Sequence, residues 1–270
     1  MEDILKKEVV YKVDSMEEVN VSKNIVYKAY ENTKLFMDMY FSKNSKEKSP
    51  AVVLVHGEAH NINFKEVGQY VSLGKLVAAA GLKAVTFNHR VLSDGFTIEE
   101  VNSDINELIK FLIENADKLS IDENKIAIWC FSGGAPFGLY AGINSFSNNV
   151  KCIAAYYGIS DFKVAAQLFG ADVNIKAEEV EKYSPINIID KNPHDIPPML
   201  IARAGLDNPI LNDSLDKFIM KALDNNLSID IYNHTDGGHA FDLFNDNGRT
   251  HDIMAKTLDF LKKHLKQFSN

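Results

Sequence analysis

The chain contains little of what marks secreted, membrane-bound or nucleic-acid-binding proteins. Its two cysteines, Cys130 and Cys152, both lie in apolar runs, which argues against a disulfide framework or a cysteine metal site and favours a reducing compartment. No apolar run approaches the roughly 18 residues of a membrane-spanning helix, and the first residues lack the pattern of a signal peptide. A formal net charge of −8 without a basic cluster disfavours nucleic acid and anionic membranes as partners. The sequence therefore predicts a cytoplasmic protein.

Internal repeats and low-complexity segments are also missing. The 270 residues suffice for one large α/β domain and are too few for two, and the apolar fraction of 46% is that of a globular protein. We expect a single domain over residues 1–270, and a homo-oligomer is compatible with this composition.

Hydrophobic patterning indicates alternating strands and helices. Period-2 apolar residues predict strands at 8–13 and within 24–41, where Glu31–Thr33 suggests a hairpin turn. A continuous apolar run, typical of a strand buried on both faces of a parallel sheet, occurs at 51–55, and further strands are predicted at 82–87, 125–131, 151–157, 198–202 and 227–232. Helices are predicted at about 66–80, 98–118, 133–144, 211–225 and 249–267. This order predicts an α/β fold, a mostly parallel central sheet with helices on both faces, with an insertion at about 162–196.

Polar residues gather where the predicted strands end. In sheets of this kind, ligands bind at the carboxyl ends of the parallel strands. The residues at those ends are His56, Gly57, Glu58, Asn88, His89, Arg90, Ser132, Ser160, Asp161, Asp207 and His239. We therefore expect a site for binding or chemistry among them.

Residues 126–138 predict a sharp turn from a strand into a helix, with Ser132 at the bend. This layout is a nucleophile elbow, whose serine has strained backbone geometry and whose neighbours must be small because strand and helix come close. Gly134 meets that need, whereas Cys130 stands where the G-x-S-x-G pattern has its first glycine. An ordinary glycine-rich turn is the alternative on this stretch alone.

The strand ends contain the three groups of a serine hydrolase. A serine becomes nucleophilic when a histidine accepts its proton and a carboxylate orients that histidine. One of each occurs here in the order Ser132, Asp207, His239, which is the chain order of α/β-hydrolases. Asp161, after the preceding strand, is the alternative carboxylate.

With these residues in this order, the chain resembles the α/β-hydrolase superfamily, most closely its dienelactone-hydrolase-like and small carboxylesterase (acetyl-esterase-like) branch. The resemblance covers nearly the whole chain from about residue 24; besides the elbow it rests on segments 35–40, 51–57, 84–90, 103–104, 183–185, 197–207 and 237–242. It implies an α/β-hydrolase fold with a small cap insertion. It also implies Ser132 as nucleophile, His239 as general base and acid, and Asp207 as the orienting carboxylate.

The resemblance further implies an oxyanion hole of two backbone N–H groups. One is that of Gly133, directly after the serine, and the other that of Glu58, or alternatively Ala59. Many relatives have a run of glycines at this second position. Because a carboxylate would oppose the charge of the intermediate, we expect the Glu58 side chain to point outward. A hydrogen bond from it to a polar substrate is the alternative.

Other conspicuous residues fit structural roles. We expect Arg90 to pair with Asp104, and Cys130 and Trp129 to be buried and unreactive. The histidines, His56, His60, His89 and His234, do not have the spacing of a metal site, since Gly57 interrupts any helix that could align the first two. We expect neither a metal nor a cofactor.

Together these features predict a serine hydrolase that cleaves carboxylic esters, with small-acyl esters preferred, through an acyl-enzyme on Ser132. The insertion residues Phe162, Leu168, Phe169 and Tyr183 either wall the acyl pocket or pack the cap onto the sheet. The alternatives are a peptidase, amidase or lactone hydrolase of the same superfamily, and a non-catalytic member that binds a small ligand.

Overall fold

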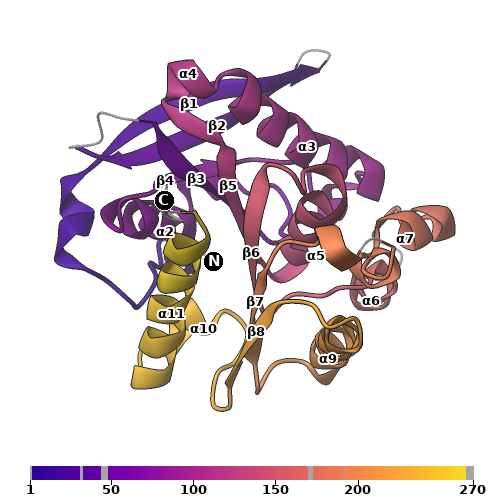
Figure 1. Cartoon of the computed structure of the whole chain (residues 1–270). Helices are drawn as coiled ribbons and strands as arrows, with labels where there is room; N and C mark the ends of the chain where they lie inside the picture. The colour runs from indigo at the N-terminus through magenta and orange to yellow at the C-terminus, as the bar shows by residue number, and fades with distance from the viewer. Residues whose placement is uncertain (1, 31–32, 44–47, 170–172, 192, 266–270) are drawn as a thin grey trace.

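An eight-stranded sheet runs through the molecule (Figure 1). The computed structural model describes residues 2–30, 33–43, 48–169, 173–191 and 193–265. The strands are β1 (Val19–Tyr30), β2 (Thr33–Ser42), β3 (Ser49–Val55), β4 (Lys83–Phe87), β5 (Ile121–Phe131), β6 (Val150–Tyr156), β7 (Met199–Ala204) and β8 (Ile229–His234), in the spatial order β1-β2-β4-β3-β5-β6-β7-β8. The pairs β1–β2 and β2–β4 are antiparallel, and every pair from β4 to β8 is parallel. The predicted mostly parallel sheet is confirmed.

Helices cover both faces of this sheet (Figure 1). One face carries α2 (Gly68–Ala79) and α11 (Gly248–Leu265), and the other carries α3 (Ile98–Glu114), α5 (Ala135–Tyr140) and α9 (Pro209–Asp224). The apolar run of β3 is continuous for this reason. Val53 and Val55 pack on the side of α3 and α5, whereas Val52 and Leu54 pack on the side of α2 and α11.

Local signals set the bounds of the helices. Thr97 caps α3, its side chain accepting from the Glu100 amide while the Glu100 carboxylate accepts from the Thr97 amide. Gly81, with φ +82°, follows the end of α2 as predicted. The helix predicted at 98–118 is two helices, α3 and α4 (Ala116–Leu119), divided at Asn115. The short remaining helices include α1 (Glu2–Leu5) and α10 (Phe241–Phe244).

The strand predicted at 8–13 is wrong. This segment has no regular structure and lies against α2. The Val9 amide donates to the Ser72 hydroxyl at 3.0 Å, and the Val10 amide donates to the Asp242 carbonyl at 2.8 Å. Val9 is fully buried, so its apolar character serves the core beneath α2 and not a sheet edge. The hairpin of β1 and β2 is confirmed, although Glu31 and Asn32 of its predicted turn lie outside the described residues.

The described part of residues 162–196, predicted as an insertion, includes the short helices α6 (Phe162–Phe169), α7 (Ala177–Tyr183) and α8 (Pro185–Ile188), which lie beside α5 and α9 (Figure 1). The Phe162 ring packs on Phe137, with ring centroids 4.9 Å apart, and the Tyr183 ring packs on Tyr140 at 5.1 Å. Tyr183 also donates to Glu99 of α3. These two aromatic residues therefore attach the insertion to the helices beneath it.

Ion pairs fix the loop after β4. Arg90 donates through its Nε and Nη2 atoms to the two carboxylate oxygens of Asp104, both at 2.8 Å, as predicted, and Lys28 of β1 donates to the same carboxylate at 2.7 Å. Asp104 is fully buried, and its hydrogen bonds with Arg90 and Lys28 keep the pKa of this carboxyl below its usual value despite burial. Within the described residues, no helix is both long and apolar enough to cross a membrane.

Candidate active site

Ser132 lies at a strained bend between β5 and α5. Its φ is +51°, in the left-handed region that side-chain-bearing residues rarely adopt. The next residues form a single tight turn, Ser132–Gly134, before α5 begins at Ala135. A Cβ at Gly134 would lie 2.0 Å from the carbonyl oxygen of His56, so this position tolerates no side chain. The stretch therefore has the geometry of the predicted elbow.

The cysteine in place of the first elbow glycine is accommodated by Gly138. A Cβ at Gly138 would lie 2.6 Å from the Cβ of Cys130. Because Gly138 in α5 has no side chain, the cysteine side chain fits between β5 and α5. Cys130 is fully buried, and burial raises the pKa of its thiol well above the usual range. The thiol is therefore a packing group, as expected, and Trp129 beside it is also fully buried.

Three side chains predicted to act together meet at the carboxyl ends of β5, β7 and β8. Ser132 Oγ lies 2.8 Å from His239 Nε2, and His239 Nδ1 lies 2.6 Å from Asp207 Oδ2. Since Asp207 accepts from Nδ1, Nε2 is free to accept the serine proton. The Asp207 side chain is 5% exposed and that of His239 is 39% exposed, so the carboxylate is shielded while the imidazole faces the solvent side.

Asp161, the alternative carboxylate, makes other contacts. Its Oδ1 accepts from the Lys163 amide at 2.9 Å and from the Ser184 hydroxyl at 3.4 Å. These bonds hold the start of α6 against the start of α8, at the base of the insertion. The structure thus brings Asp207, and not Asp161, to His239.

A buried network that the sequence did not reveal supports His239. The Tyr157 ring meets the His239 ring edge-on, with centroids 4.8 Å apart. The Tyr157 hydroxyl donates to Asp242 at 2.6 Å, and Gln69 of α2 donates to the same carboxylate at 2.8 Å. Asp242 is fully buried, and burial raises its pKa. The spacing of three residues between His239 and Asp242 is the one local signal that could have pointed to this network.

The turn after β3 is held by stacked histidines. The His56 ring stacks on His89 at 3.6 Å and on Phe64 at 4.0 Å. Burial lowers the pKa of both imidazoles, so they are neutral packing groups. The Gly57 amide donates to the Tyr70 hydroxyl at 3.0 Å. Together these contacts fix the turn beside the elbow.

The two amides predicted as oxyanion donors are neighbours. A Cβ at Gly133 would lie 3.3 Å from the Glu58 nitrogen, so the two backbones are adjacent next to Ser132. Within the described residues, the Glu58 amide donates to no backbone or side-chain acceptor. This amide is thus available to a bound group.

The expectation that the Glu58 side chain points outward is wrong. A Cβ at Gly133 would lie 2.5 Å from Glu58 Cγ, so the side-chain stem lies against Gly133. Glu58 Oε2 accepts from the amide and hydroxyl of Ser93 at 3.3 and 3.4 Å, and Oε1 is buried with no partner among the described residues. Burial raises the pKa of this carboxyl to about 7. The expectation failed because it assumed an ionised group, whereas a protonated carboxyl can be buried.

A cavity of about 360 Å³ opens above these groups. It is lined by Glu58, Ser132, Gly133, Ile159, Leu168, Leu211 and His239. Leu168 is one of the insertion residues proposed as a pocket wall. Phe162, the first residue of α6, is instead fully buried against Phe137. The side chain of Phe169 lies outside the described residues. Ile159 and Leu211 were missed because only polar residues were sought at the strand ends.

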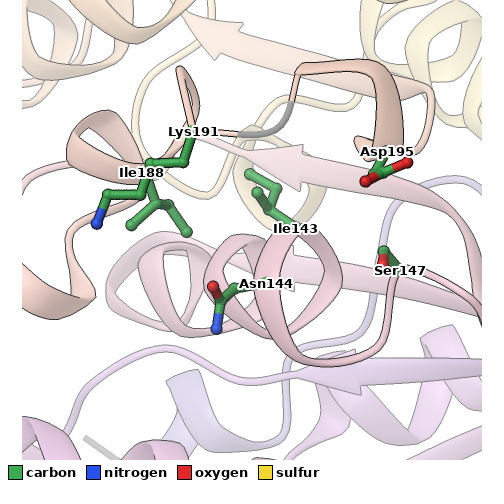
Figure 2. Close-up of a pocket in the computed structure, with 6 residues that line it drawn as sticks. All are labelled: Ile143, Asn144, Ser147, Ile188, Lys191 and Asp195. Atoms are coloured by element: carbon green, nitrogen blue, oxygen red, sulfur yellow. The ribbon is translucent and has the colours of Figure 1, made fainter.

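A second hollow lies near the residues that precede β6 and β7 (Figure 2). Its volume is about 60 Å³, and its lining comprises Ile143, Asn144, Ser147, Ile188, Lys191 and Asp195. Figure 2 shows the Lys191 and Asp195 side chains on opposite sides of the hollow. It is too small for a typical ligand pocket of about 300 Å³ or more. In the part of the chain that the structure describes, no cluster of histidine, cysteine or acidic residues could hold a metal ion.

A model of the BD-FAE family matches residues 37–218, more than half of the chain, including Ser132 and Asp207. The chain belongs to the BD-FAE family. This BD-FAE member is 29% identical over 133 residues to a probable isoprenylcysteine alpha-carbonyl methylesterase of Oryza sativa subsp. japonica, a match covering 46% of this chain and 31% of the relative. A similar methylesterase of Arabidopsis thaliana is 29% identical over 149 residues, 52% of this chain and 34% of the relative. The chain spans about a third of the length of these curated relatives.

Several solved structures that share this fold are named as esterases. A truncated carbohydrate esterase from gut microbiota superposes with a TM-score of 0.74 at 20% identity, covering 92% of this chain and 97% of the other. An esterase of Thermogutta terrifontis gives 0.72 at 17% identity, covering 94% and 96%. At such identities the likeness shows the α/β-hydrolase fold. The family and these relatives agree with the predicted superfamily and with a carboxylic ester hydrolase, whereas the dienelactone-hydrolase-like branch stays a prediction.

Proposed function

We propose that this BD-FAE member hydrolyses carboxylic esters with Ser132 as nucleophile, His239 as general base and acid, and Asp207 as the orienting carboxylate. The observation that carries the proposal is the continuous chain from Ser132 Oγ through His239 to Asp207, with separations of 2.8 and 2.6 Å, at a strained elbow. Strain of this kind persists where the surrounding structure enforces it, and it is frequent at active sites.

The reaction follows from this geometry. Ser132 Oγ attacks the ester carbonyl carbon while its proton passes to His239 Nε2, and the imidazolium is stabilised by Asp207. The carbonyl oxygen becomes negative and is held by the amides of Gly133 and Glu58. The tetrahedral intermediate then collapses: the bond from the carbonyl carbon to the alcohol oxygen breaks, and the departing alcohol takes the proton from His239. Water activated by His239 then hydrolyses the acyl-enzyme on Ser132 and releases the acid.

The cavity favours a small acyl group. A volume of about 360 Å³ lies near the lower end of ligand pockets, and the walls away from Ser132 are the apolar side chains of Ile159, Leu168 and Leu211. We therefore propose short, uncharged acyl chains, and residues 162–196 as a cap that supplies Leu168. The methylesterases among the relatives act, by their name, on a methyl ester, which agrees with a compact pocket. Cytoplasmic location and a homo-oligomer stay proposals on composition alone.

Nitrophenyl esters of rising acyl length test the substrate class. We expect acetate and butyrate to be cleaved with a kcat/KM at least tenfold above that for octanoate and longer chains, and the matching anilides to react far more slowly. The Ser132→Ala variant is the matched control and should show only the background rate. Faster cleavage of the anilides than of the esters would favour the amidase alternative instead.

A further inference from the structure

Glu58 is an acidic residue in a place where negative charge opposes the proposed chemistry. Its backbone amide is one of the two proposed oxyanion donors, and its side-chain stem lies against the other donor residue, Gly133. Glu58 is also one of the residues that line the cavity with Ser132 and His239. An ionised carboxyl here would therefore lie close to the small space in which the carbonyl oxygen becomes negative.

The surroundings of the carboxyl group suit its uncharged form. Oε1 is fully buried and has no partner among the described residues, and Oε2 has two long hydrogen bonds from Ser93. Among the described residues, no cation pairs with this carboxyl. Asp94, next to Ser93, is a charged group near it and pairs with exposed His60. His239, which lines the same cavity, is engaged by Asp207. Burying a carboxylate without a cation is costly, whereas burying a protonated carboxyl costs less.

We propose that Glu58 is a positioning residue of the oxyanion site that works in its uncharged form: its neutral carboxyl, held on Ser93, keeps the Glu58 amide beside Gly133 and leaves the site free of negative charge. This inference rests on the proposed ester hydrolysis. It assigns a role to the side chain in addition to the one proposed for the backbone.

The consequence is a loss of activity as pH rises. The pKa of about 7 places the ionisation of Glu58 within the working range of an esterase. Two like charges several ångströms apart, at the effective dielectric constant of about 20 found near protein surfaces, change a rate on the order of tenfold to a hundredfold. The rate also rises with pH on the acid side, because His239 must be neutral to accept the serine proton. The wild-type protein should thus have a bell-shaped profile.

The test is the pH dependence of kcat/KM for nitrophenyl acetate, corrected for spontaneous hydrolysis, in the full chain and three variants. Glu58→Gln keeps the shape of a protonated carboxyl but cannot ionise. We expect the kcat/KM of this variant, taken relative to its own value at pH 6, to lack the alkaline decline of at least tenfold that the wild type shows. Ser93→Ala removes a hydrogen bond that stabilises the charged form, so its decline should shift to higher pH. Glu114→Gln, an exposed carboxylate at the end of α3, should keep the wild-type profile.

The outcomes are distinct. An alkaline decline of the same size in wild type and Glu58→Gln overturns the inference and leaves the proposed function standing. A folded Glu58→Gln variant that is inactive at pH 6 also overturns it, because a neutral side chain would then not suffice. Wild-type protein that cleaves no ester at any pH contradicts the proposed function, and this inference with it.

Discussion

Replacing Glu58 with glutamine is expected to change the free energy of unfolding more favourably at alkaline pH than at acidic pH. In the folded chain the pKa of this carboxyl is raised from 4.5 to about 7 by burial. A raised pKa means that the folded state holds the proton more tightly than the unfolded state does. The resulting stability is fully present below pH 4.5 and is lost as pH rises to about 7.

The magnitude follows from the size of the pKa shift. One pKa unit corresponds to about 1.4 kcal/mol, so the shift from 4.5 to about 7 amounts to about 3 kcal/mol above pH 7. About 1 kcal/mol of this is already lost at pH 5, which leaves a change of about 2 kcal/mol between pH 5 and pH 8. Glutamine does not ionise, and any constant cost of its amide cancels when the two pH values are compared.

Urea denaturation at pH 5 and pH 8 measures this difference. The free energy of unfolding of Glu58→Gln minus that of the wild type should rise by about 2 kcal/mol between the two pH values. The same subtraction for Glu114→Gln, whose carboxyl is exposed, should change by less than about 0.5 kcal/mol. A Glu58→Gln difference that is equal at both pH values would refute the claim that the Glu58 carboxyl is buried and neutral.

Three further substitutions, two of them with a control variant, test the site and its elbow. Asp207→Asn should lower kcat for ester hydrolysis about 10⁴-fold, because His239 is no longer held in the tautomer that can accept the serine proton. Asp161→Asn should change kcat by less than about threefold. A larger loss of kcat in Asp161→Asn than in Asp207→Asn would show that the wrong carboxylate had been assigned. Gly134→Ala should cost about 3 kcal/mol or more in urea denaturation, since its Cβ would lie 2.0 Å from a backbone oxygen, and Gly248→Ala, with open space around it, should cost less than about 1 kcal/mol. Cys130→Gly should lose about 1–3 kcal/mol of stability through the cavity it leaves yet keep kcat/KM within about fivefold; an inactive but folded variant would mean that the thiol does more than pack.

Much of the fold could be predicted because its signals are local. The continuous apolar run at 51–55 indicates burial on both faces, and a capping box such as that of Thr97 and Glu100 favours the start of a helix. The failure at 8–13 has the opposite cause. Its alternation suits an edge strand equally well, and the partners that decide the matter, Ser72 and Asp242, lie far along the chain.

The residues of the site could be predicted from the sequence, whereas the burial and contacts of their side chains could not. The chain order of Ser132, Asp207 and His239, together with their positions after strands, was enough to bring them together. The neutral state of Glu58 depends on what buries it, which no local pattern encodes. Apolar identity likewise does not tell which way a side chain faces, so Phe162 and Tyr183 pack under the insertion while Leu168 lines the cavity.

The most direct test of the central claim is the reaction of the full chain with a fluorophosphonate, followed by peptide mapping by mass spectrometry. A nucleophilic serine activated by His239 should form one covalent adduct, located on Ser132, and neither Ser132→Ala nor His239→Ala should label at a comparable rate. A folded wild-type protein that remains unlabelled, or an adduct on a different serine, would contradict the assignment of Ser132 as the nucleophile.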